Sequence, residues 1–279
     1  MREPSIRTSR LAIAGGLAAV LVIGGSGFLL GRLSVPPREK SVAISTPPLV
    51  APDPVEPLKV LRRADLIALA HQVSDALASN RAMPATVASL AGQRFELFVP
   101  FGCSGPSAET GSQPMGWRYD AANSTLRISV TPVTWAADQW RVGSTMGTPA
   151  EGFWIARPWS SSEQCPASGV QPGPAGADPV TLPEHTLAIA QFSTAERSAL
   201  FRDGKPLELV KRVPPDMLNM SQGLRLRIIG RIDREFGPVR CVQPAGAEQR
   251  PLCVISARID EMMIENPVSD ELLGSWSTR

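Results

Sequence analysis

The 279-residue chain is poor in the side chains that carry most enzymatic acid–base and metal chemistry. It has two histidines and one tyrosine, and only 19% of its residues are charged. None of the four cysteines lies in a C-x-x-C pair, and two histidines leave few donors for a Cys/His zinc site. The sequence therefore predicts no cofactor and no metal.

A strong excess of one charge sign is also absent from most of the chain. Residues 1–40 carry six of the 28 Lys/Arg and two of the 26 Asp/Glu, so the remainder is nearly neutral. A near-neutral body argues against binding along a phosphate backbone. We therefore expect no nucleic-acid partner.

Long apolar runs are missing too, with one exception near the N-terminus. Residues 11–31, LAIAGGLAAVLVIGGSGFLLG, contain no charge and lie between Arg10 and Arg32. As a helix they would span about 31 Å at ~1.5 Å per residue, which matches a hydrocarbon core of ~30 Å. The run is longer than the apolar part of a cleaved signal peptide, and no small-x-small cleavage site follows it. The sequence predicts a retained signal anchor that crosses the lipid bilayer once.

The charges that flank this span are nearly balanced and do not fix its orientation. The basic tail is only ten residues long, and the cysteines and prolines beyond the span suit an oxidising exterior. We expect a bacterial inner-membrane protein with a cytoplasmic N-terminus and a periplasmic body. Gly27 and Gly31 have the spacing of a helix-dimer face, which raises self-association as a hypothesis. The alternative is the ordinary glycine enrichment of membrane helices.

All four cysteines lie after the span, and their even number predicts two disulfides. Cys241 and Cys253 flank a polar loop that a hairpin can close, which leaves Cys103 to pair with Cys165. The alternative is four free thiols in a cytosolic protein.

The exterior part changes its pattern along the chain. Residues 33–57 contain seven prolines and predict an extended spacer, and residues 58–79 repeat apolar side chains at helical spacing. A second short helix is expected from Pro84 to Gly92. From Arg94 onward the period is two, which predicts strands at 95–101, 152–159, 185–192, 223–232, 252–259 and 261–265, and a hairpin over 117–132.

The fold class that follows is mainly β, an antiparallel sandwich or barrel-like arrangement in one or two lobes. A transmembrane helix and a short helical pair precede the β body. The predicted segments are a cytoplasmic tail (1–10), a transmembrane helix (11–31), a Pro-rich linker (32–57), a helical segment (58–92), a Trp-rich β lobe (93–166), a Gly/Pro loop (167–183) and a second β lobe (184–279).

The stretch VPFGCSGPSAETG, residues 99–111, most resembles a site of nucleophilic chemistry. Ser104 is followed directly by Gly105, and Pro106 occupies the place of the second glycine of a G-x-S-x-G elbow, so that motif fails. A Cys103 nucleophile would need a histidine base, and only His71 and His185 exist. His185 is kept as a weak acid–base candidate. The carboxylates near residue 260, including Glu265, predict a solvated strand face rather than a catalytic pair.

Five of the six tryptophans fall within a short part of the first expected lobe. On a β surface they could stack on sugar rings, because an indole offers a flat apolar face and a polar edge. The alternative is that they fill a core with few other aromatics. These candidate ligand-surface residues are Trp117, Trp135, Trp140, Trp154 and Trp159.

With no complete catalytic constellation, the sequence favours a non-enzymatic protein that binds or helps assemble a component of the bacterial envelope, with an envelope protein as partner. The alternative is a membrane-tethered module that binds or hydrolyses cell-wall glycan through the Trp-rich lobe. A cleft that holds a tryptophan together with His185 or a carboxylate would favour the second hypothesis.

Overall fold

The structure, a computed structural model, describes residues 59–108, 113–140, 148–166, 185–193, 207–244 and 246–277. The predicted tail, transmembrane helix, dimer face and linker, residues 1–57, lie outside these ranges. Among the described helices, none has the length and apolar character needed to cross a bilayer. All described residues belong to one compact unit, which begins at Glu56.

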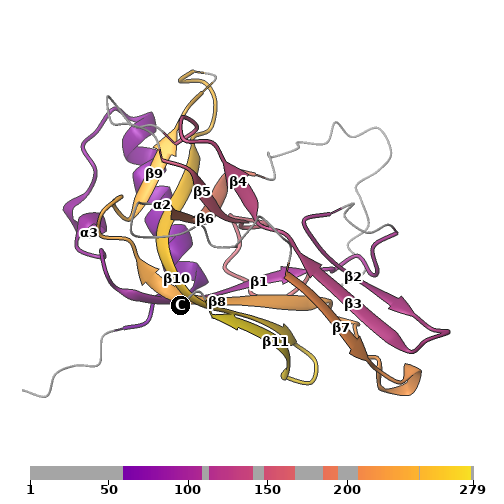
Figure 1. Cartoon of the computed structure of the whole chain (residues 1–279). Coiled ribbons are helices and arrows are strands. Elements are labelled where there is room, and N and C mark those ends of the chain that lie inside the picture. The colour runs from indigo at the N-terminus through magenta and orange to yellow at the C-terminus, as the bar shows by residue number, and fades with distance from the viewer. Residues whose placement is uncertain are drawn as a thin grey trace, which may run out of the picture. The chain divides into compact units, whose positions relative to one another are not determined.

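Two β-sheets dominate the described residues, which confirms the expected mainly β body (Figure 1). The helical elements are α2 (Arg63–Ala78), α3 (Ala85–Ala88) and the 3-10 turn η2 (Pro215–Met217). The larger sheet has eight strands: β1 (Arg94–Phe101), β4 (Val133–Trp135), β5 (Ala150–Trp154), β6 (Leu187–Phe192), β8 (Leu224–Ile232), β9 (Val239–Val242), β10 (Leu252–Asn266) and β11 (Glu271–Ser277). The smaller sheet has three: β2 (Met115–Asp120), β3 (Thr125–Val130) and β7 (Leu207–Arg212).

Strand β10 is the centre of the larger sheet. The order is β1-β8-β10-β6-β5-β4, and both β9 and β11 also pair with β10. The β6–β10 pair is parallel, whereas the other strand pairs are antiparallel as expected. Strands β1 and β5 precede residues 167–183 in the chain, yet they pair with β8 and β6, which follow those residues. The expected boundary therefore does not separate two sheets.

Several strands differ from the sequence expectation. The two runs at 252–259 and 261–265 form one strand, β10, because a shift in register between Ile259 and Glu261 restores the pairing with β8. The expected strand at 152–159 ends at Trp154. Strands β4, β7, β9 and β11 were not predicted, because they are short or have mixed polarity and lie beside a single partner strand.

Helix α2 packs its predicted apolar stripe against β1, β9 and β10. Leu66, Leu69, Ala70 and Val73 are buried in the main core. Leu77, which continues the same helical spacing, is 39% exposed near the helix end. At the start of the helix, the backbone N–H of Arg62 donates a hydrogen bond to the side chain of Asp65.

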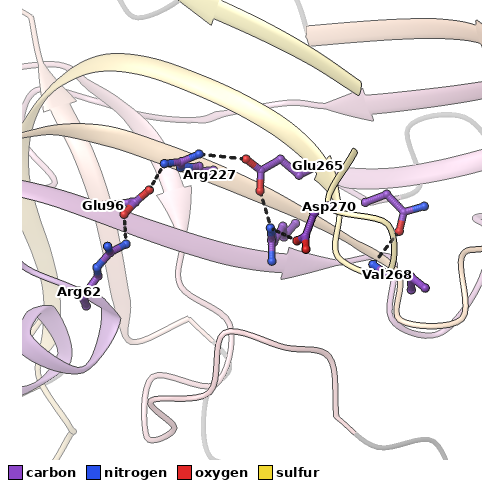
Figure 2. Close-up of polar contacts among 8 residues, drawn as sticks. Arg62, Glu96, Arg227, Glu265, Val268 and Asp270 are labelled. Carbon is purple, nitrogen blue, oxygen red and sulfur yellow. Dashed lines mark hydrogen bonds and ion pairs between the residues drawn. The ribbon is translucent and has the colours of Figure 1, made fainter. Parts of the chain in front are cut away.

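An ion-pair ladder crosses β1, β8 and β10 on one face of the larger sheet, and Figure 2 shows it. Acids and arginines alternate along the ladder, in the order Arg62, Glu96, Arg227, Glu265, Arg225 and Asp270. Arg225 and Arg227 of β8 also lie over the ring of Phe98, at 4.9 and 5.6 Å from its centroid. The expected solvated face is wrong for Glu265, which is buried because two arginines neutralise it.

Replacing Glu265 by Gln is expected to lower the free energy of unfolding by about 2 kcal/mol. Its carboxylate, 9% exposed, accepts from Arg225 Nε at 2.7 Å and from Arg227 at 3.2 Å, and bonds to charged partners are worth about 1.5–3 kcal/mol. Denaturant titration of the full chain measures the loss. Lys211→Gln is the control, because its ion pair with Glu271 is exposed and should cost below ~0.5 kcal/mol. Equal losses in the two variants would contradict a special role for the ladder.

Candidate functional site

Both predicted disulfides form, and they have different surroundings. Cys241 and Cys253 face each other across the antiparallel β9–β10 pair, as expected for a hairpin. Cys103 and Cys165, with Cα atoms 5.4 Å apart, join the loop after β1 to the loop that follows β5. No free cysteine remains, so neither Cys103 nor any other thiol is available as a nucleophile.

The five candidate tryptophans divide into buried and accessible members. Trp117 is 7% exposed in the main core, and its indole N–H donates to the carbonyl of Gly102 at 3.3 Å. Trp135 and Trp140 are also buried, in a second apolar cluster that Trp154 borders. The core alternative therefore holds for these three side chains. Trp159 is different, because it is 50% exposed.

A groove of about 760 Å³ gathers the accessible aromatics against the Cys103–Cys165 loop. Such a volume lies within the range of ~300–1,000 Å³ typical of small-ligand sites. The residues that line it are Pro100–Ala108, Gln113–Met115, Thr131, Val133, Phe153, Trp154, Ala156, Arg157, Trp159 and His185. We call this site the Trp159 groove.

Aromatic rings form one part of the Trp159 groove. The rings of Trp154 and His185 lie 5.1 Å apart and are tilted by 40°. Trp154 is fixed in turn by Trp135, whose ring meets it edge-on at 5.3 Å. His185 lies just before β6 and Trp154 ends β5, and the two rings meet because these strands pair. The sequence alone does not reveal that pairing.

Tight backbone packing supports the other part of the Trp159 groove. Gly223, just before β8, has a φ of +63°, and a Cβ there would lie 2.6 Å from the carbonyl oxygen of Phe101 and 3.0 Å from Cys165 Sγ. Only glycine tolerates both the left-handed backbone and this approach. The end of β1 and the Cys103–Cys165 disulfide are therefore packed closely against the residue that precedes β8.

A buried arginine holds the segment that carries Trp159. Arg63, in the first turn of α2, is 0% exposed. Its guanidinium donates to four main-chain carbonyls, those of Ser160 at 3.0 Å, Ala156 at 2.5 Å, Arg157 at 3.2 Å and Phe98 at 3.5 Å. Burial, with repulsion from Arg157 as the next cause, lowers the pKa of Arg63 to about 10, so the group is charged at neutral pH. Helix α2 thus fixes the loop between β5 and Cys165.

The electrostatics of the Trp159 groove are set by Arg157 and His185. No Asp or Glu is among the described residues that line it. Arg157 donates to the carbonyl of Gln164 at 2.5 Å and has a φ of +51°, an uncommon conformation for a non-glycine residue. Residues in such conformations concentrate at functional sites.

The described lining of the Trp159 groove combines aromatic rings with one histidine and one arginine. Among the described residues that line it, no Asp or Glu stands beside His185 to orient the imidazole. No group of three potential metal ligands occurs within the described residues either. His71, the other histidine, is exposed on α2 and does not line the groove; burial, followed by repulsion from Arg250, lowers its pKa.

Sequence reasoning missed the roles of Arg63 and Arg157. The sequence did hold one signal for Arg63. A cation in the first turn of a helix interacts unfavourably with the helix dipole, so its presence there indicates that it has other partners. Nothing in the pattern distinguished Arg157, because its role depends on the loop conformation. Comparison of the chain with protein-family models, with curated proteins and with solved structures finds no match.

Proposed function

We propose that this chain is a non-enzymatic glycan-binding component of the bacterial envelope, and that the Trp159 groove is its binding site. The observation that carries the proposal is the meeting of Trp154, Trp159 and His185 in one groove. Indole rings offer flat apolar faces with a polar edge, and the ring of a sugar has a complementary C–H face bounded by hydroxyl groups.

The placement of this module is part of the same proposal. The uncharged segment at residues 11–31 anchors the chain in the inner membrane and leaves the β body in the periplasm. Two disulfides in the body support an oxidising compartment outside the cytoplasm. Self-association through Gly27 and Gly31 and an envelope protein partner stay predictions.

The choice of binding over hydrolysis rests on what the described lining contains. Glycosidases generally need two carboxyl groups across the scissile bond, one to protonate and one to attack or to activate water. The described residues of the Trp159 groove supply an arginine and a histidine instead. The groove is therefore suited to hold a saccharide without cleaving it.

Replacing Trp159 by Ala is expected to weaken glycan binding at least tenfold. The side chain is half exposed, so little stability is lost, whereas its stacking surface disappears. Calorimetry with the full chain in lipid nanodiscs and a β-1,4-linked N-acetylglucosamine tetrasaccharide measures the change. Met217→Ala is the control, because Met217 is 71% exposed and does not line the groove. Equal affinities of wild type and Trp159→Ala would contradict this site.

A further inference from the structure

We propose that the Trp159 groove selects an acidic saccharide, with the Arg157 guanidinium as the group that binds the sugar carboxylate. This inference rests on the proposed function and adds the class of ligand. It places the sugar ring against the tryptophans and the acid group of the same sugar against Arg157.

The charge of the described lining is the first argument. Arg157 supplies a cationic guanidinium and His185 an imidazole. No Asp or Glu is among the described residues that line the groove with them. Elsewhere in the described part of the chain, the half-buried arginines of β8 each meet a glutamate. Arg157 forms no ion pair with another described residue and donates instead to the main-chain carbonyl of Gln164. A groove of this charge favours an anionic ligand.

The fixed position of Arg157 is the second argument. Its own carbonyl and that of Ala156 accept hydrogen bonds from the buried Arg63, so the backbone on the N-terminal side is held. On the other side its side chain is tied to Gln164, next to the disulfide at Cys165. Preorganisation of this kind lowers the entropy lost when a ligand binds.

The chemistry of the guanidinium is the third argument. Arginine has five N–H donors in a planar fork, and Gln164 takes one of them. The remaining donors match the two oxygens of a carboxylate, and such bidentate pairs are stronger than bonds between neutral groups. A neutral sugar hydroxyl would use these donors less well.

The distance along the chain between Arg157 and the stacking ring is the fourth argument. Trp159 follows Arg157 after a single residue, the buried Pro158, and both residues line the same groove. A sugar that stacks on Trp159 therefore lies beside the short segment that carries Arg157. An acid group on that edge is the ligand feature that uses both side chains together.

Two tetrasaccharides that share one backbone test this inference. The neutral probe is β-1,4-linked N-acetylglucosamine, and the acidic probe alternates it with N-acetylmuramic acid, which adds a lactyl carboxylate to every second ring. We expect the full chain, in nanodiscs of zwitterionic lipid, to bind the acidic probe at least tenfold more tightly. The preference should shrink as salt is raised, because it depends on charge.

Variants of Arg157 test whether this residue causes the preference for the acidic probe. Arg157→Gln is expected to abolish the preference while it keeps binding of the neutral probe, and Arg157→Lys to retain an intermediate preference because it keeps charge and loses the fork. Arg94→Gln, an exposed arginine outside the groove, should leave the preference unchanged and controls for net charge.

The outcomes separate the inference from the function beneath it. Equal binding of the two probes by wild type, or an unchanged preference in Arg157→Gln, would overturn the acidic-sugar inference and leave glycan binding intact. Absence of binding to either probe would overturn the proposed function itself. Thermal unfolding of each variant, compared with wild type, shows whether a lost preference reflects a lost fold.

Discussion

Replacement of Cys103 and Cys165 by serine should lower the free energy of unfolding by about 4 kcal/mol and abolish binding in the Trp159 groove. The cross-link joins residues 62 apart in sequence, and its loss restores that loop entropy to the unfolded chain. The same cross-link holds the loop that lines the groove against the segment that carries Arg157 and Trp159. Chemical denaturation and calorimetric titration with the tetrasaccharides measure the two effects.

The second disulfide provides the matched control. Replacing Cys241 and Cys253 by alanine opens a shorter loop of 12 residues and should cost about 3 kcal/mol on the same chain-entropy model. These cysteines do not line the Trp159 groove, so binding should persist in the folded variant. The free energy of unfolding of a typical domain is about 5–15 kcal/mol. Both variants should therefore still fold at moderate temperature. Loss of binding in both, or in neither, would contradict the assigned role of the first disulfide.

Replacement of Arg63 by methionine is the second large effect that we expect, a loss of about 3 kcal/mol, because several main-chain carbonyls lose a charged donor together. Methionine has a similar length but no donors, so the carbonyls of Ala156, Arg157 and Ser160 lose their shared partner. Hydrogen bonds to a charged donor are worth about 1.5–3 kcal/mol each, and these part-buried carbonyls regain some of that from water. Denaturant titration reports the stability.

Two further variants make this prediction specific. Arg81→Met removes an exposed arginine shortly after α2, whose ion pair with Asp75 is 63% and 68% exposed, and should cost less than about 1 kcal/mol. Arg63→Lys keeps the charge but cannot reach several carbonyls with one ammonium, so it should fall between wild type and Arg63→Met. A stability of Arg63→Met equal to that of wild type would show that the clamp is dispensable.

Arg63 also couples stability to binding. Because it holds the backbone on which Arg157 and Trp159 stand, a partly folded Arg63→Met should bind both tetrasaccharides weakly. Glu265→Gln disturbs a ladder elsewhere on the larger sheet and should reduce stability without this loss of affinity. The pair of variants thus separates a positioning effect on the groove from general destabilisation.

The sequence alone determined the features that depend on local pattern. Period-two alternation predicted β1, β8 and β10, and helical spacing predicted α2, because each pattern follows directly from backbone geometry. The pairing of Cys241 with Cys253 was predicted for the same reason, since a hairpin brings near neighbours together. The long apolar run at residues 11–31 likewise needs no tertiary context to suggest a bilayer span.

The tertiary structure decided what depends on contacts between distant segments. The parallel pairing of β6 with β10 and the entry of β5 beside β6 bring Trp154 and His185 into one groove, and no local pattern encodes a strand order. Glu265, which reads as a solvated carboxylate, is buried because two arginines from β8 reach it. Arg63 is buried because it donates to the carbonyls of Ser160 and Ala156, more than ninety residues away, and to that of Phe98 in β1. Burial of charge depends on partners far apart in sequence, so the fold alone could reveal it.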